Sequence, residues 1–322
     1  MNTLPDGSAS QPSEEEAVVL IMHLRPARNK ARTAATAEAL QLLGDLGVSA
    51  LNGGPLSEQG SLFWISIPPA HISEAKRRLP RLGYTYAVDL VRLAETAEDS
   101  PPEERRLVRW RRKTYELVRV YEENAEAMRE MAPDRRSFLI QIGDEVREIQ
   151  GYRGDGAPLS RRGLPVYDAR LLVNLVRAQA GARFLDPFAG IGGIVIEALA
   201  SDYEVSSSDI DPILQPGLAA LGATHQVADA AALPFATASI DIIATELPFH
   251  ESIHGMLAAA LREMDRVLRP GGRVSVCGVP DQAPLLRAAA AALEWQAYVD
   301  TPINRKGLDV VVIAWKKPPA AA

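Results

Sequence analysis

Residues 184–198, Phe-Leu-Asp-Pro-Phe-Ala-Gly-Ile-Gly-Gly-Ile-Val-Ile-Glu-Ala, have the composition and spacing of a cradle for a nucleotide-type cofactor. An apolar run leads into a turn with three glycines, and an apolar segment of helical character follows. A strand, a glycine turn and a helix in this order bind such cofactors at the carboxyl end of a parallel sheet. Asp209 ends the next predicted strand, where its carboxylate is placed to bond a ribose diol.

The spacing of these glycines separates two cofactor classes. They fall at 190, 192 and 193 after the acidic Asp186, which departs from the dinucleotide fingerprint G-x-G-x-x-G. A dinucleotide needs amide groups aimed at a pyrophosphate, whereas a carboxylate in the turn suits a cofactor with a positive charge and no phosphate. S-adenosylmethionine (SAM), with its ammonium and sulfonium, is such a molecule. The alternative, a glycine turn without a ligand, is disfavoured by the motifs downstream.

Three further motifs end successive predicted strands. Residues 206–211 read Ser-Ser-Ser-Asp-Ile-Asp, and residues 227–230 read Val-Ala-Asp-Ala. Residues 241–250 read Asp-Ile-Ile-Ala-Thr-Glu-Leu-Pro-Phe-His. Because the carboxyl ends of parallel strands share one sheet edge, these motifs are expected to meet at the glycine turn.

This series resembles the class I SAM-dependent methyltransferases. More narrowly, residues 166–317 resemble the tRNA guanosine-N2-methyltransferase family, whose members carry an N-terminal ferredoxin-like domain and often a THUMP domain. The family's first loop reads close to Asp-Pro-Phe-x-Gly-x-Gly-Gly, its third strand ends in Asp-Ala, and residues 163–176 resemble its lead-in helix. The resemblance and the strand-end placement imply a set of SAM-binding residues: Asp186, Pro187, Phe188, Gly190, Gly192, Asp209, Ile210, Asp229 and Ala230.

The fourth-strand motif implies the acceptor. In the family it reads Asp-Pro-Pro-Tyr or Asp-Leu-Pro-Phe: a carboxylate or amide and a proline carbonyl hold an exocyclic amine, and the aromatic ring stacks on the base. By this resemblance Glu246, Pro248 and Phe249 are the catalytic candidates. Glu246 stands where Asp or Asn is expected, which leaves three outcomes open: the backbone compensates, the substrate differs, or the domain binds SAM without transferring.

Composition narrows the class of protein. The single cysteine, Cys277, allows no internal disulfide and fits a reducing cytoplasm, and its valine neighbours predict burial in a strand. No apolar run reaches the roughly 18 residues of a membrane span. Residues 1–16 lack the basic start and apolar core of a signal peptide and are expected to be a disordered tail. We therefore expect a cytoplasmic protein with no membrane partner.

The net charge of −6 gives no global attraction to nucleic acid, but arginines cluster locally. Two interpretations of residues 105–113 stay open: contact with a phosphate backbone, or a solvated face paired with nearby glutamates. The substrate-binding candidates are Arg109, Arg112, Arg135, Arg136 and, from the loop after the fourth-strand motif, His250. His250 and His254 lack a third ligand at metal-binding spacing, so no metal is expected.

The elements that must position these residues form two units. Strands near 17–24, 48–51, 61–67 and 84–93, with helices near 30–46 and 71–79, give the βαββαβ order of a ferredoxin-like domain. From 164 the pattern is regular α/β, and it predicts a mostly parallel Rossmann-like sheet with one antiparallel strand near its edge. The expected domains are therefore residues 17–94, a region at 95–163, and a methyltransferase domain at 164–317 before a tail at 318–322. Two interpretations of 95–163 stay open: a reduced THUMP-like domain or a separate connector. Within this region, 107–121 is expected to have strand-like character, 123–131 to be helical and 138–142 to be a strand. In the methyltransferase domain, strands are expected at 204–209 and 240–246, and the last two strands are expected to pair as a hairpin.

The function expected from these features is SAM-dependent methylation of an exocyclic amino group in RNA, with guanosine N2 of tRNA as the leading acceptor. Related motifs also serve amino groups in DNA and amides in protein, and a catalytically silent SAM- or RNA-binding protein is the third alternative. The N-terminal unit and the arginine cluster favour RNA. The sequence does not indicate an oligomeric state.

Overall fold

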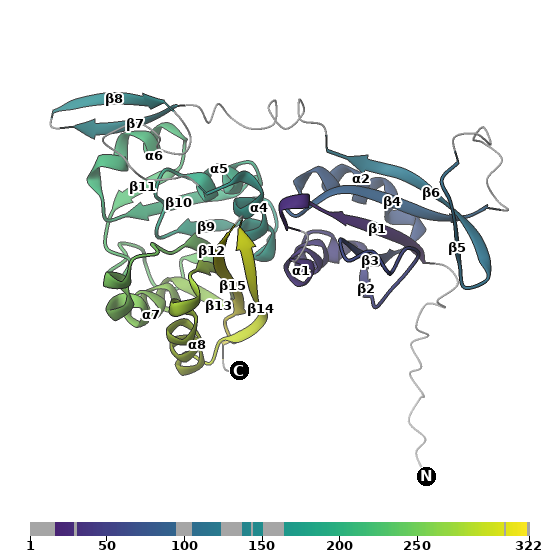
Figure 1. Ribbon diagram of the computed structural model, residues 1–322. Helices are drawn as coiled ribbons and strands as arrows, with labels where there is room; N and C mark the ends of the chain where they lie inside the picture. The colour runs from purple at the N-terminus through teal and green to yellow at the C-terminus, as the bar shows by residue number, and fades with distance from the viewer. Residues whose placement is uncertain are drawn as a thin grey trace, which may run out of the picture.

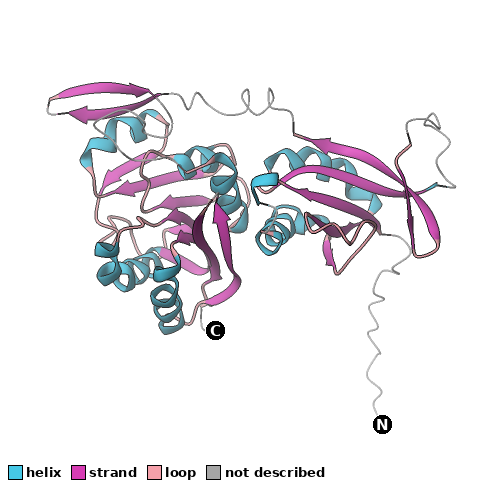
Figure 2. Ribbon diagram, in the orientation of Figure 1, coloured by secondary structure: helices cyan, strands magenta, loops and turns pink. Residues whose placement is uncertain are grey.

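The computed structural model describes residues 17–28, 31–94, 105–123, 137–142, 144–150, 164–305 and 307–320. Within them lie two large sheets, each with its own helices, and a separate two-stranded sheet (Figures 1 and 2). The α/β class that the sequence predicts is confirmed, with an antiparallel N-terminal sheet and a mostly parallel C-terminal one.

The N-terminal unit has the expected βαββαβ order. Its first four strands lie in the order β2-β3-β1-β4, and the pairs β2–β3, β3–β1 and β1–β4 are antiparallel. This is the strand order of a ferredoxin-like sheet. The elements are β1 (Val18–Leu24), α1 (Arg32–Leu43), β2 (Ser49–Leu51), β3 (Leu62–Ile67), α2 (Ile72–Arg78) and β4 (Thr85–Leu93).

The same sheet continues into part of the region that the sequence analysis assigns to the connector. Strands β5 (Leu107–Trp110) and β6 (Lys113–Glu122) form a hairpin, and β6 pairs with β4. The strand-like character expected for 107–121 is confirmed, but the stretch is divided in two because Arg111 and Arg112 take left-handed φ angles of 46° and 65° and reverse the chain. The usual glycine or asparagine signal for such a turn is absent here, so the sequence pattern does not reveal it. The predicted helix at 123–131 falls almost wholly outside the described residues.

The C-terminal unit is a seven-stranded sheet in the order β11-β10-β9-β12-β13-β15-β14. Strand β15 runs antiparallel to both of its neighbours, β13 and β14, and it pairs with β14 as the expected hairpin. The strands are β9 (Arg183–Asp186), β10 (Glu204–Asp209), β11 (Thr224–Val227), β12 (Ile240–Glu246), β13 (Leu268–Gly278), β14 (Gln296–Arg305) and β15 (Leu308–Lys316).

Helices cover both faces of this sheet, which explains why its central strands are apolar throughout. One buried cluster joins α4 and α5 to the sheet through Phe184 and Ala244, and a second joins α7 and α8 to it through Leu185 and Ile243. The helices are α4 (Val166–Leu175), α5 (Gly193–Leu199), α6 (Gln215–Ala220), α7 (Leu257–Val267) and α8 (Ala283–Ala292). Cys277 is buried in β13, as the sequence predicts.

In the sequence between the two units, β7 (Ser137–Ile142) and β8 (Glu145–Gln150) form a small hairpin, which packs on the C-terminal unit at the end away from the N-terminal sheet (Figure 1). Strand β7 lies on α6 and on the 3-10 turn Pro212–Leu214, and Ile140 is fully buried there. The prediction of a strand at 138–142 is confirmed.

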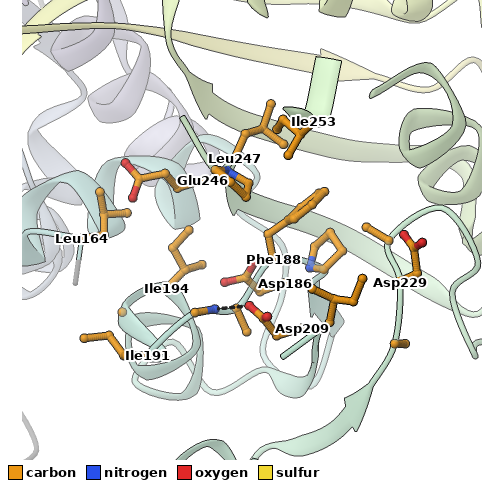
Figure 3. A pocket seen from close by; sticks show the side chains of 18 of the residues that line it. Leu164, Asp186, Phe188, Ile191, Ile194, Asp209, Asp229, Glu246, Leu247 and Ile253 are labelled. Carbon is orange, nitrogen blue, oxygen red and sulfur yellow. Dashed lines mark hydrogen bonds between the residues drawn. The ribbon is translucent and has the colours of Figure 1, made fainter. Parts of the chain in front are cut away.

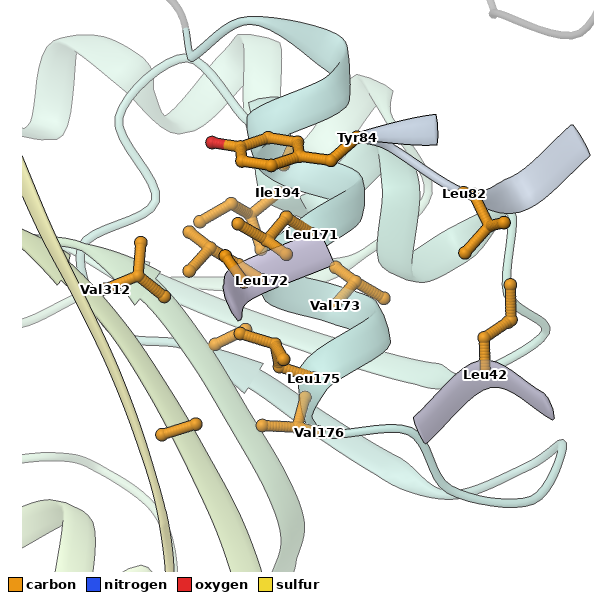
Figure 4. Packing of buried hydrophobic residues seen from close by; sticks show 14 of the residues in the cluster. Leu42, Leu82, Tyr84, Leu171, Leu172, Val173, Leu175, Val176, Ile194 and Val312 are labelled. Carbon is orange, nitrogen blue, oxygen red and sulfur yellow. The ribbon is translucent and has the colours of Figure 1, made fainter. Parts of the chain in front are cut away.

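The two units share a packed interface. Leu42, Leu82 and Tyr84 of the N-terminal unit join one hydrophobic cluster with α4 residues such as Leu171 (Figure 4). Across it, Asn174 donates to the buried carboxylate of Glu38, which also accepts from the amides of Gly83 and Tyr84. Burial raises the pKa of Glu38 to about 7 against these hydrogen bonds.

Candidate functional site

A cavity of about 540 Å³ opens at the carboxyl ends of β9, β10 and β12 (Figure 3). Ligands bind at this edge of an open α/β sheet, at the point between β9 and β12 where the strand order reverses. Eight of the nine SAM-binding candidates line it, and so do Glu246 and Pro248. The cavity therefore gathers the strand-end motifs in one place, as their order along the chain predicts.

The glycine turn shapes one wall, but its glycines have different tasks. Gly190 has φ +51° and lines the cavity, and nothing lies within 4 Å of where a Cβ would stand. Gly192 is not among the lining residues. Its φ is +79°, and a Cβ there would lie 2.5 Å from a methyl of Leu221. Gly192 was expected to bind cofactor; the structure instead has it pack the turn against the chain after α6.

Asp186 ends β9 on the floor of the cavity and is 1% exposed. Its Oδ1 accepts hydrogen bonds from the hydroxyl of Thr245 at 2.7 Å and from the amide of Phe188 at 3.2 Å. Burial raises the pKa of Asp186 to about 7 despite these bonds, and the nearby charges of Asp209 and Glu246 raise it further. A cationic ligand beside this carboxyl would favour its ionised form, which fits the ammonium of SAM.

This carboxyl gives SAM binding a defined pH dependence. Below about pH 7 Asp186 is protonated, so an ammonium loses its counter-charge; SAM affinity will rise about tenfold between about pH 5.5 and 7.5. The stability of the ligand-free protein depends on pH in the opposite direction. Because the pKa of Asp186 in the folded state lies above the ordinary 3.8, its contribution to the free energy of unfolding falls as the pH rises from about 4 to 7. Calorimetric titration of SAM across this range measures the effect, and an affinity independent of pH would contradict it. The variant Asp186→Asn should remove this pH dependence.

Asp209 and Asp229 line the part of the cavity beside β10 and β11. Asp209 Oδ2 accepts from the amide of Gly190 at 2.8 Å, and its Oδ1 accepts from the amide of Asp211 at 3.0 Å, so the carboxylate is fixed in orientation. Asp229 is held likewise by the amide of Ala231 at 2.8 Å. Ile210 lies between these acids and is 68% exposed, which offers an apolar surface to an adenine ring. These residues fit the adenosine end of SAM.

The acceptor motif follows β12 on the other side of Asp186. Glu246, Leu247 and Pro248 line the cavity, while Phe249 lies outside its lining and is 36% exposed. The Pro248 carbonyl accepts a hydrogen bond from Nε2 of Gln282 at 2.7 Å. Gln282 is fully buried, and its Oε1 accepts from the amide of Val279. One lone pair of the proline carbonyl is therefore already engaged in holding the motif.

Glu246 forms an ion pair with Arg305. Its Oε1 accepts from Nη1 of Arg305 at 2.7 Å, and the Arg305 guanidinium also lies 5.7 Å from the Phe249 ring centroid. Burial raises the pKa of Glu246, while the charge and hydrogen bond of Arg305 oppose that rise. His250 is exposed beyond the motif, and its Nδ1 accepts from the amide of Ser252 to cap the 3-10 turn Glu251–Met256. Ser252 and Met256 of that turn line the cavity.

The other substrate-binding candidates lie far from this cavity. Arg109 is on β5 and Arg112 in the hairpin turn, at the end of the N-terminal unit that points away from the C-terminal sheet (Figure 1). The side chain of Arg111 stacks on Trp110 with 4.6 Å between the guanidinium and the ring centroid. Arg106 instead pairs with the buried Asp89, which compensates its charge, although half of the Arg106 side chain is exposed. Arg135 and Arg136 lie outside the described residues.

Membrane-spanning helices and metal-binding clusters are both absent from the described part of the chain. Among those residues no helix is long and apolar enough to cross a membrane. They also contain no group of three or more His, Cys, Asp or Glu side chains arranged to hold a metal ion.

The strand order, the glycine turn and the acids at three strand ends give a Rossmann-like domain with a cavity suited to a nucleotide-type cofactor. A comparison with protein families agrees: residues 185–276 match a family described as a methyltransferase domain.

Several known proteins are similar to parts of the chain. A ubiquinone/menaquinone biosynthesis C-methyltransferase of Rubrivivax gelatinosus is 30% identical over 45% of this chain and 62% of its own length. A tRNA (guanine(10)-N2)-dimethyltransferase of Methanothermobacter thermautotrophicus is 54% identical over 43 residues, 13% of each chain. The U6 snRNA (guanine-N(2))-methyltransferase THUMPD2 of Bos taurus is 28% identical over 53% of this chain and 36% of its own.

The chain thus spans less than two thirds of the length of each of these relatives. Among solved structures, TrmN from Thermus thermophilus aligns with 93% of this chain and 99% of its own, at 18% identity and a TM-score of 0.47.

Sequence reasoning missed two kinds of site residue. The first is apolar lining: Ile191 and Ile194 within the glycine-turn motif, and Leu164, Ile253 and Met256 outside it. The second comprises Arg305 and Gln282, which act on the acceptor motif from β14 and from the turn before α8. This second pair has no local signal, because only the folded sheet brings it to the end of β12.

Proposed function

We propose that this protein is a SAM-dependent methyltransferase that acts on an exocyclic amino group of a nucleobase in RNA, with guanine N2 in tRNA as the preferred acceptor. The observation that carries the proposal is the adjacency of Glu246 to the cavity floor formed by Asp186. The carboxylate proposed to accept hydrogen bonds from the substrate amine, Glu246, and the residues proposed to bind SAM line the same cavity.

The chemistry follows from what these residues can do. When bound, SAM supplies a methyl group whose bond to sulfur breaks as a bond to the acceptor nitrogen forms. The lone pair of an aromatic amine is conjugated with its ring, so acceptors on its two hydrogens favour the pyramidal, nucleophilic form. The Glu246 carboxylate and the remaining lone pair of the Pro248 carbonyl are proposed to supply them. Alignment at this site is the main catalytic contribution.

Phe249 supports a nucleobase as the acceptor. Its ring is 36% exposed beside the acceptor motif, and Arg305 lies near it. A base that is splayed out of its stack can stack on such a ring while its amino group enters the cavity. The Rubrivivax relative is named as a C-methyltransferase, and a carbon acceptor has no amino hydrogens for Glu246 to hold. Guanine N2 is favoured by the names of the tRNA and U6 snRNA relatives.

The acceptor class is tested by methyl transfer from tritiated SAM to total RNA, to DNA and to protein at equal mass. The proposal expects label in RNA alone, and a Phe249→Ala variant should retain SAM binding but lose most of the transfer. Label in DNA or protein would overturn the choice of RNA. SAM binding without any transfer would instead support the catalytically silent alternative.

A cytoplasmic location remains a prediction from the single, buried cysteine.

The basic hairpin is proposed to contact RNA phosphates at a distance from the reacting base. Reversing charge in Arg109→Glu/Arg112→Glu should weaken tRNA binding and reduce the slope of log affinity against log salt by about two, because two phosphate contacts are lost. Glu116→Gln, on the paired strand, is a poor control because Glu116 is buried against Arg92. Arg77→Glu, on the exposed face of α2, is the better one. An unchanged slope in the double variant would identify the cluster as a solvated face.

A further inference from the structure

Arg305 stands where three parts of the acceptor site meet. It is the last residue of β14, and its side chain is only 10% exposed. Nη1 lies 2.7 Å from Glu246 Oε1 and 3.8 Å from the sulfur of Cys277, and the guanidinium lies 5.7 Å from the Phe249 ring centroid. A single side chain therefore contacts both polar and aromatic members of the acceptor motif.

The other side of Arg305 faces a second buried charge. Asp168 Oδ2, on α4, lies 4.0 Å from Arg305 Nη1. Asp168 is held in turn by Arg28 of the N-terminal unit, at 2.7 Å to Oδ2 and 3.0 Å to Oδ1, and by the hydroxyl of Tyr84 at 2.5 Å. Charges thus alternate from the N-terminal unit to the acceptor motif: Arg28, Asp168, Arg305, Glu246.

We propose that Arg305 is a positioning residue for the methyl-transfer step, which holds the Glu246 carboxylate ionised and aimed at the acceptor amine. The inference rests on the proposed function, since it assigns a task within that reaction. Glu246 is one methylene longer than the residue usual in the related motif, and a longer side chain needs a second fixed point. Arg305 supplies it from a strand whose partner β15 is buried in the sheet.

The charges around Glu246 show why this fixed point must be a cation. Asp168 and Asp186 face it as carboxyls, Cys277 faces it as a thiol, and Arg305 is the cation with which it forms an ion pair. Burial and the neighbouring carboxylates all disfavour the ionised form, which is the form that accepts two hydrogen bonds without donating one. Loss of the guanidinium would therefore leave a carboxyl that is protonated over more of the pH range and free to rotate.

The test compares Arg305→Gln and Arg305→Lys with Arg287→Gln. The control lies on α8 and pairs with Asp300 of β14, so it breaks an exposed ion pair to the same strand. We expect kcat of Arg305→Gln to fall about 10- to 100-fold, as for a misalignment of about 1 Å, with the SAM dissociation constant unchanged. The acidic limb of its pH–rate profile should move to higher pH, because the charge that favours ionised Glu246 is gone. Arg305→Lys should restore part of both effects, and the control should show neither.

A second readout is independent of the RNA substrate. Titration of ¹³C-carboxyl glutamate by NMR, with the Glu246 resonance assigned by its loss in Glu246→Gln, should show a higher pKa in Arg305→Gln than in the wild type. If the wild-type protein transfers no methyl to RNA, the proposed function fails, and the titration still decides whether Arg305 controls Glu246. An unchanged Glu246 titration, or an Arg305→Gln variant with wild-type kcat and pH profile on a working assay, would overturn the inference.

Discussion

Replacing Glu246 by glutamine will lower the turnover number about 100-fold and leave SAM affinity within about twofold of the wild type. The amide keeps the shape and one acceptor oxygen, but it loses the ion pair with Arg305 that fixes the carboxylate. Its NH₂ group can then turn toward the hydrogens of the acceptor amine, which it cannot accept from. SAM itself is bound by Asp186 and Asp209 in the proposed arrangement, so its dissociation constant should be insensitive to the change. Single-turnover methyl transfer and calorimetric titration measure the two quantities separately.

Two companion variants sharpen this prediction. Glu251→Gln removes an exposed acid from the neighbouring 3-10 turn and should retain full turnover. Glu246→Asp restores the residue usual in the related motif, but the shorter side chain would lose contact with Arg305, so activity should fall rather than rise. Wild-type transfer by Glu246→Ala would remove this residue from the mechanism.

Asp209→Ala will weaken SAM binding by about 1.5–3 kcal/mol, the worth of a charge-assisted hydrogen bond. That loss corresponds to roughly a 10- to 150-fold increase in the dissociation constant. The carboxylate is proposed to accept from the ribose hydroxyls, and it already orients the glycine turn through the amide of Gly190. Calorimetry on the variant therefore reports both the lost contact and the loosened turn.

Glu204→Ala supplies the matched control, because Glu204 begins the same strand, β10, and is exposed at its opposite end. Its SAM affinity should equal that of the wild type. An Asp209→Ala variant that also keeps wild-type affinity would show that the ribose lies elsewhere in the cavity.

The fold was predictable wherever hydrophobic period and turn residues agree. The strand at 240–246 was placed to the residue because its apolar run is flanked by polar turns, and the acid that ends the strand at 204–209 was placed by its position in the series of strand-end motifs. The ferredoxin-like order followed from the same alternation. The β5–β6 turn was not predicted, because Arg111 and Arg112 adopt left-handed backbone angles that are not expected for arginine.

The cofactor side of the site was predictable for a related reason: its residues lie in strand-end motifs that topology brings together. Gly192 shows the limit, since a glycine required by a left-handed turn and by contact with Leu221 looks the same in sequence as one that admits a ligand. Arg305 and Gln282 were beyond prediction, because each reaches the acceptor motif across strands that are distant in sequence. Long-range pairs of this kind leave no local pattern.

The most direct test of the central claim is nucleoside analysis of tRNA after reaction with SAM that carries a deuterated methyl group. RNA from cells that lack this protein should serve as substrate, so that the acceptor position is unmethylated at the start. The account predicts deuterated N2-methylguanosine, present with the wild-type protein and reduced about 100-fold with Glu246→Gln. Deuterium on another nucleoside, or at a carbon or ribose position of guanosine, would contradict it.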